Sequence, residues 1–339
     1  DLLDSGTLAR YVADLSVTGL TSNPTIFERA ISGTNSYDDA IRSQRGHGDS
    51  PERLFFELAL VDILEAADLF RPTYDATGGL DGFASIEVSP TLADDAQATI
   101  AAAKALHARA EHPNVLIKVP GTQAGLVAIE ELIFAGVPIN VTLLFSRSHY
   151  RGTMEAYLKG IERRVEADLD PHVPSVASLF ISRWDAHTAS LLSGDLANRL
   201  GVAVAQRTYR VYREMLASRR WEQLAAAGAH PQRLLWASTG TKDPALPDSY
   251  YVSALAAERT VNTMPEKTLL AFGDHGKLRG ALGEDASEAD RLVAEVSKAG
   301  VDVDALATRL QMEGRDLFVE SWNDLLRCIA ARRNAVSAA

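Results

Sequence analysis

The chain has 339 residues, of which 46% are hydrophobic and 23% are charged, a balance typical of a folded globular protein and unlike a disordered one. Its formal net charge of -11 disfavours nonspecific binding to nucleic acid or to an anionic membrane, although it is compatible with a local basic pocket. The single cysteine, Cys328, excludes a disulfide or a cysteine-based zinc site within this sequence, and we expect a cytoplasmic location.

The first segment places apolar residues at helical spacing and predicts a helix over residues 1–15. This segment has neither the basic nor the apolar part of a signal peptide. No apolar run in the chain approaches the roughly 18 residues of a membrane span. We therefore expect no membrane partner.

After this helix the sequence repeats one pattern, a short apolar run that ends in small polar residues and alternates with helical segments. The apolar runs cover residues 17–23, 83–89, 115–122, 139–144, 175–180, 234–240 and 260–264. The helical segments cover residues 51–70, 92–110, 123–135, 146–166, 184–216 and 250–258. This alternation indicates βαβ units and a parallel sheet, so we predict an α/β fold, a (β/α)8 TIM barrel.

A barrel of this kind needs one strand more than these runs supply, and we expect the first strand to lie before Asp1. Residues 285–339 have a helical pattern with a break near 302–304. No stretch of linker composition divides the chain. We therefore predict a single domain over residues 1–339, which includes the C-terminal helical segment 285–339.

Lys118 places a charged group inside the apolar run VLIKVPGT. A buried ammonium group is costly unless it is paired or neutral. A neutral amine is a nucleophile that can attack a ketone, and the resulting iminium ion withdraws electrons from an adjacent carbon–carbon bond. The alternatives are a structural ion pair with Glu87 and a side chain that reaches solvent.

Glu87 interrupts the preceding apolar run, FASIEVS, in the same way. A carboxylic acid near the amine can relay protons as a carbinolamine forms and loses water, and a hydroxyl such as that of Thr142 can hold this water. Alternatively, Glu87 is only a counter-ion for Lys118, and the Thr142 hydroxyl bonds to the backbone of its own strand.

Further polar side chains occur in or after the predicted strands, where a barrel carries its reactive groups. Asn23 and Asn140 can bind sugar hydroxyls, although Asn23 also suits a turn. Ser178, Arg183 and Ser238 can form an anion pocket for a sugar phosphate, because guanidinium and hydroxyl groups bind phosphate; Arg183 could equally be a solvated surface charge. Histidines with metal-ligand spacing and nucleotide-binding loops are both absent from the sequence, so a metal site and nucleotide binding are not leading hypotheses.

Several longer motifs resemble the transaldolase family, in particular its bacterial, actinobacterial-type subgroup. The motifs are GLTSNPTIF over 19–27, LIKVPGTQAG over 116–125, NVTLLFS over 140–146, WASTGTK over 236–242 and TVNTMP over 260–265. They occur in order over nearly the whole chain, which makes the resemblance more specific than any one short pattern.

The resemblance implies that Lys118 is the Schiff-base lysine on the fourth barrel strand, Glu87 the third-strand acid and Thr142 the hydroxyl that holds its water. The remaining residues match contacts to the bound ketol, sugar and phosphate: Asn23, Asn140, Ser178, Arg183 and Ser238. The implied reaction transfers dihydroxyacetone from sedoheptulose 7-phosphate or fructose 6-phosphate to glyceraldehyde 3-phosphate or erythrose 4-phosphate. It belongs to the nonoxidative pentose phosphate pathway and uses no metal or cofactor.

Two features depart from the family pattern. The family has a first-strand aspartate that takes the C4-hydroxyl proton, and we expect it before Asp1, because Asp1, Asp4 and Asp14 fall on the opening helix. An arginine that follows the seventh-strand serine in better-known members is absent from WASTGTK, and Lys242 is the candidate that replaces its charge.

Two alternatives to a transaldolase remain open at this point. The first is an aldolase of the fructose 6-phosphate type, which uses the same lysine but releases free dihydroxyacetone. The second is a barrel that binds sugar phosphates or a partner protein without turnover. Product analysis with and without an aldehyde acceptor separates the first from a transaldolase.

Overall fold

The computed structural model describes residues 2–43, 50–278 and 280–338. The chain divides into two compact units. Unit 1 consists of Asp1–Val119 with Arg315–Ala339, and unit 2 of Pro120–Gly314. The predicted single domain over residues 1–339 stays a prediction, and each unit is described separately.

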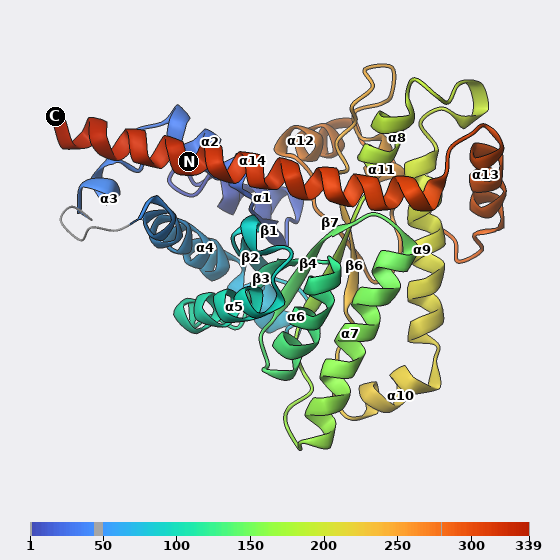
Figure 1. Ribbon diagram of the computed structural model, residues 1–339, viewed down its shortest axis with the longest axis horizontal. Coiled ribbons are helices and arrows are strands. Elements are labelled where there is room, and N and C mark those ends of the chain that lie inside the picture. Colours follow the sequence, from blue (N-terminus) through green and yellow to red (C-terminus); the bar gives the residue numbers. More distant parts are fainter. Residues whose placement is uncertain (1, 44–49, 279, 339) are drawn as a thin grey trace. The chain divides into compact units, whose positions relative to one another are not determined.

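Unit 1 contains three parallel strands that pair in chain order (Figure 1). They are β1 (Gly19–Thr21), β2 (Phe83–Glu87) and β3 (Val115–Pro120). The helical elements are α1 (Thr7–Leu15), α2 (Pro24–Gly33), α3 (Asp38–Ser43), α4 (Pro51–Ala76), η1 (Pro90–Leu92) and α5 (Ala96–Ala110). The register sets Gly19 opposite Phe83 and Glu87 opposite Lys118. Every residue of β2 and β3 is buried, as expected for parallel strands covered on both faces.

Unit 2 contains four parallel strands, again paired in chain order. They are β4 (Ile139–Leu144), β5 (Ser175–Phe180), β6 (Arg233–Ala237) and β7 (Thr260–Asn262). The helical elements are α6 (Gln123–Phe134), α7 (Arg147–Glu166), α8 (Ser182–Thr188), η2 (Gly194–Leu196), α9 (Leu200–Leu216), α10 (Arg219–Ala226), α11 (Tyr250–Ala254), α12 (Glu266–His275) and α13 (Ser287–Lys298). Helix α7 packs on β4 and β5, and α9 packs on β6 (Figure 1).

The last helix, α14 (Val303–Ala338), is drawn in Figure 1 as one long rod. Its residues up to Gly314 belong to unit 2, and those from Arg315 onward belong to unit 1. No helix of the described residues combines the length and the apolar character that crossing a membrane requires.

Side-chain caps start several helices directly after the strands or loops that precede them. The Thr122 hydroxyl accepts a hydrogen bond from the Gly125 amide at the start of α6, and the Ser146 hydroxyl accepts one from His149 at the start of α7. Each cap satisfies an amide that the first helical turn leaves without a partner. Because these residues come within two positions of β3 and β4, the chain turns from strand into helix with a short connection.

All seven predicted strands are confirmed within the described residues, and so is the break between α13 and α14. The predicted continuous helix over residues 184–216 is wrong, because the chain forms α8, η2 and α9 there. Gly194 and Asn198 both have positive φ, of 57° and 56°, and a right-handed helix cannot pass through such residues. Four helices were not predicted: α2, α3, α10 and α12. The opening helix begins at Thr7 instead of residue 1.

A glycine sets the close approach of α6 and α7 in unit 2. A Cβ atom on Gly160 would lie 2.7 Å from Cβ and Cγ2 of Ile133 and 2.9 Å from the Glu130 carbonyl oxygen. Gly160→Ala should therefore lower the free energy of unfolding by about 1–3 kcal/mol in urea denaturation. The control is Gly283→Ala, where a Cβ atom meets nothing within 4 Å, and it should change stability by less than about 0.5 kcal/mol. Equal effects of the two substitutions would contradict this packing argument.

Candidate active site

The side chain of Lys118 lies buried in unit 1 beside that of Glu87. Lys118 Nζ donates to Glu87 Oε2 at 3.0 Å and to the Ser22 carbonyl oxygen at 3.4 Å. Both side chains belong to residues that are only 7% exposed. The two residues are direct partners in the parallel register of β2 and β3, so the fold itself holds the amine and the carboxyl together. Glu87 ends its strand and Lys118 lies two residues before the end of its own, so the pair is at the carboxyl ends.

Burial has a direct effect on the protonation of this pair. It raises the pKa of the Glu87 carboxyl above its ordinary value, and the attraction of Lys118 opposes part of the shift. A higher pKa favours the protonated form of the carboxyl, so Glu87 can act as a proton donor beside the amine. The geometry thus fits an ion pair and also fits a proton transfer that frees the nucleophile.

Phe318 of α14 is the aromatic neighbour of the lysine, and sequence reasoning missed it. Its ring centroid lies 5.3 Å from Lys118 Nζ. Helix α14 is held nearby because the Trp322 ring lies 5.1 Å from that of Phe55 and the Thr25 hydroxyl donates to Ser321 Oγ at 3.0 Å. Nothing in the local sequence signals this contact, because it joins β3 to a helix near the other end of the chain.

Strands β4 and β5 bring two of the predicted residues together, although Asn140 is the second residue of β4 and not at its carboxyl end as predicted. Ser178 Oγ on β5 donates to Asn140 Oδ1 on β4 at 2.7 Å, and both residues are buried. Thr142, two residues after Asn140, has a fully buried hydroxyl that finds no hydrogen-bond partner among the described residues. A buried polar group without a protein partner is a candidate for binding water or substrate.

Arg183 lies in α8, three residues after the end of β5, and Ser238 directly follows β6. Ser182 Oγ and Ser238 Oγ share a hydrogen bond of 2.9 Å, and the Ser182 amide donates to the Ser238 carbonyl at 3.0 Å. The Arg183 guanidinium makes no hydrogen bond and no ion pair with any of the described residues. It lies 6.0 Å from the Phe180 ring centroid, and burial lowers its pKa below the ordinary value. A half-buried guanidinium of this kind can still bind an anion.

Two other predicted residues have simpler surroundings. In unit 1, the side-chain oxygen of Asn23 accepts from the Ile26 amide at 2.9 Å, so Asn23 caps α2. This cap agrees with the alternative that Asn23 suits a turn, and its role as a ketol ligand stays a prediction. Lys242 of unit 2 is exposed to solvent. No cluster of three or more metal-ligand side chains occurs among residues 2–43, 50–278 and 280–338.

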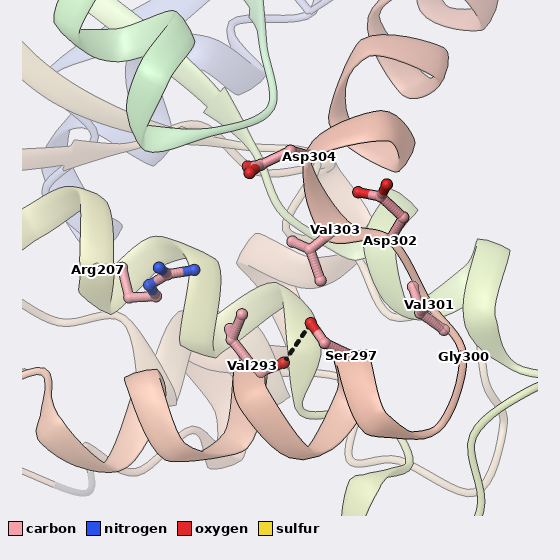
Figure 2. Close-up of a pocket in the computed structure, with 8 residues that line it drawn as sticks. All are labelled: Arg207, Val293, Ser297, Gly300, Val301, Asp302, Val303 and Asp304. Atoms are coloured by element: carbon pink, nitrogen blue, oxygen red, sulfur yellow. Dashed lines mark hydrogen bonds between the residues drawn. The ribbon is translucent and has the colours of Figure 1, made fainter.

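A surface hollow of about 400 Å³ lies elsewhere in unit 2, lined by Arg207, Val293, Ser297 and residues 300–304 (Figure 2). Ser297 turns its hydroxyl back to the Val293 carbonyl at 3.0 Å. None of the predicted site residues lines this hollow. We assign the chemistry to the strand ends, because the buried amine and carboxyl lie there.

Parallel βα units with an amine and a carboxyl buried side by side near the strand ends are typical of an α/β enzyme. Comparisons with known proteins agree with this class. A transaldolase of Frankia alni is 42% identical, with 97% of this chain and 91% of the relative covered. Transaldolase 1 of Streptomyces avermitilis is 43% identical over 97% of this chain and 89% of its own length, and a transaldolase of Thermobifida fusca is 43% identical over 97% and 92%.

The sequence profile described as Transaldolase/Fructose-6-phosphate aldolase matches residues 1–329. The chain therefore belongs to the transaldolase/fructose-6-phosphate aldolase family. This membership and the parallel βα units agree with the predicted fold class, a (β/α)8 barrel. The further strand expected before Asp1 lies outside the described residues.

The electrostatics of the pair can be tested by removing the amine. In Lys118→Met the Glu87 carboxyl loses its counter-ion, so its pKa in the folded state rises further above the value of about 4.3 in the unfolded chain. Because the folded state then binds this proton more tightly than the unfolded chain does, the free energy of unfolding is highest below about pH 4.3. It falls as the pH rises through the folded-state pKa of Glu87. We expect the free energy of unfolding of Lys118→Met to fall between pH 5 and pH 8, towards a loss of about 3–5 kcal/mol relative to the unmodified protein.

The matched control is the double variant Lys118→Met/Glu87→Gln, which has no titrating group at this position. Urea denaturation at both pH values should show the extra pH dependence only in the single variant. If the single and double variants change in parallel, the buried carboxyl does not control the stability of this site.

Proposed function

We propose that this protein is a transaldolase that carries a dihydroxyacetone unit on Lys118 as a Schiff base. The observation that carries the proposal is the buried contact of 3.0 Å between Lys118 Nζ and Glu87 Oε2. Membership of the transaldolase/fructose-6-phosphate aldolase family supports the same activity. The phosphorylated sugars named above are the proposed donors and acceptors, within the nonoxidative pentose phosphate pathway of the cytoplasm.

In the first half of the proposed reaction, the Lys118 amine attacks the ketone carbon of the donor and a carbon–nitrogen bond forms. The carbinolamine hydroxyl takes a proton from Glu87 and leaves as water, which produces the iminium ion. The Thr142 hydroxyl, which is buried and has no hydrogen-bond partner among the described residues, is the proposed holder of this water. The C3–C4 bond then breaks, and its electron pair moves into the iminium group to give an enamine.

The C4 hydroxyl loses its proton as the aldose phosphate departs. In the family that the chain resembles, an aspartate on the first barrel strand accepts this proton. In the second half the enamine carbon attacks the carbonyl of the acceptor aldose, and the steps run in reverse until water releases the new ketose. The protonated imine is the electron sink throughout.

The remaining predicted residues are proposed to hold the sugar. Asn140 and Ser178 form a buried hydrogen-bonded pair that can exchange partners with ketol hydroxyls. The Arg183 guanidinium has no hydrogen bond or ion pair among the described residues and is the proposed main ligand of the phosphate, with Ser238 beside Ser182 as a further donor. Asn23 is proposed to use its amide nitrogen for the ketol, because its oxygen caps α2.

The covalent step has a direct test. Reduction with borohydride in the presence of fructose 6-phosphate should leave a three-carbon adduct on Lys118, located by peptide mass spectrometry. Lys118→Met should give no adduct, and Glu87→Gln should form it about 100-fold more slowly, because the proton donor is lost and the shape is kept. An unchanged intact mass of the unmodified protein after reduction would contradict the proposal.

The fate of the three-carbon unit separates a transaldolase from an aldolase. With fructose 6-phosphate and erythrose 4-phosphate together, we expect sedoheptulose 7-phosphate as the main product by mass spectrometry. With fructose 6-phosphate alone, free dihydroxyacetone should accumulate at least about tenfold more slowly, a margin that corresponds to about 1.4 kcal/mol in the barrier. Equal rates of dihydroxyacetone release with and without the acceptor would instead assign the aldolase activity.

A further inference from the structure

We propose that Gln311 of α14 is a positioning residue that fixes the end of β4 and thereby the direction of the Thr142 hydroxyl. The inference rests on the proposed function, in which Thr142 holds the water of the Schiff-base steps. The contacts that support it all lie within unit 2.

The end of β4 has an irregular backbone. The pairing of β4 with β5 shifts register between Val141 and Leu144. Leu143, inside this irregularity, has a φ of 63°, in the left-handed region that residues with a branched side chain rarely adopt. Bulges of this kind change the direction of neighbouring side chains and occur next to active sites. The direction of the Thr142 side chain therefore depends on how this backbone is held.

Gln311 holds this backbone with a single amide group. Its Nε2 donates to the Leu143 carbonyl oxygen at 2.9 Å and to the Gly121 carbonyl oxygen at 3.0 Å. The Gly121 amide in turn donates to the Thr142 carbonyl oxygen at 2.8 Å. The Gln311 side chain thus holds the Leu143 carbonyl directly and the Thr142 carbonyl through Gly121. Only an amide supplies two N–H donors here, since a carboxylate of the same shape can only accept.

Two glycines allow these contacts. A Cβ atom on Gly314 would lie 3.1 Å from Leu143 Cδ2, so the Leu143 side chain would have to move by a few tenths of an ångström to accept it. A Cβ atom on Gly121 would lie 2.3 Å from Leu144 Cδ2 and 3.2 Å from the Thr142 carbonyl oxygen. The two glycines therefore allow α14, the loop at Gly121 and β4 to lie close together beside Gln311.

The consequence concerns the Thr142 hydroxyl, which is fully buried and has no partner among the described residues. Its backbone is tied on one side through Gly121 and on the other through Leu143. A catalytic water needs a hydroxyl in one defined direction, and a displacement of about 1 Å can cost on the order of 100-fold in rate. Gln311 fixes the direction of this hydroxyl through the backbone and does not itself contact the reacting atoms.

The test compares variants that remove the two donors but keep the volume of the side chain, Gln311→Met and Gln311→Glu. We expect the borohydride-trapped adduct of fructose 6-phosphate on Lys118 to form about 10-fold to 100-fold more slowly in both. The control Met312→Ala changes the next residue of the same helix, which is 53% exposed, and should leave the rate unchanged. An unchanged rate in both Gln311 variants would overturn the inference.

A double-variant cycle distinguishes positioning of Thr142 from general damage. In the Thr142→Ala background, Gln311→Met should have less than about a twofold effect on adduct formation, because the group that it positions is gone. A further 10-fold loss in the rate of adduct formation in that background would overturn the proposal that Gln311 acts through Thr142.

Amide hydrogen exchange provides a readout that does not depend on the reaction. Residues 143–146 should exchange at least about tenfold faster in Gln311→Met than in the unmodified protein, with Met312→Ala as control. If the unmodified protein forms no adduct, the proposed function fails, and faster exchange still supports the positioning of β4. Unchanged exchange would overturn the role of Gln311 whether or not the adduct forms.

Discussion

The structure depends above all on placing an ammonium group inside an apolar sheet. Lys118 is tolerated there because Glu87 faces it at 3.0 Å and the Ser22 carbonyl accepts a second hydrogen bond. Two buried charges are rarely a net gain in stability over apolar residues of the same size, so such a pair points to chemistry more than to strength. Because side chains alternate along a strand, a shift of one residue in the register of β2 and β3 would separate the pair.

Helix α14 contributes to the candidate chemistry in each of the two units. In unit 1 it carries Phe318, whose ring covers the lysine nitrogen, and in unit 2 it carries Gln311, whose amide holds the end of β4. Functional residues often lie on loops above a rigid sheet, and here a long C-terminal helix has a similar role. A helix is more rigid than a loop, so it can fix a bulge and an aromatic contact with less residual motion.

Sequence reasoning predicted the strands well because five of them, β2 to β6, are fully buried and appear in the sequence as mainly apolar runs. It also identified Lys118 and Glu87, since a charged residue in such a run needs a partner and the two runs are neighbours. It failed over residues 184–216, where the apolar spacing continues through a segment that Gly194 and Asn198 interrupt with positive φ. Asparagine in the left-handed conformation leaves no signal in the spacing of apolar residues.

The amino-acid sequence alone determined the order of the βα units, the burial of Lys118 and Glu87, and a set of polar residues at the strand ends. These features are local, because periodicity and composition act within one strand or helix. The tertiary structure decided which groups meet: the Ser22 carbonyl and Phe318 at the lysine, Ser178 with Asn140, and Gln311 with Leu143 and Gly121. Such contacts join segments far apart in the chain, and their existence follows from the packing of the whole unit, which no local pattern encodes.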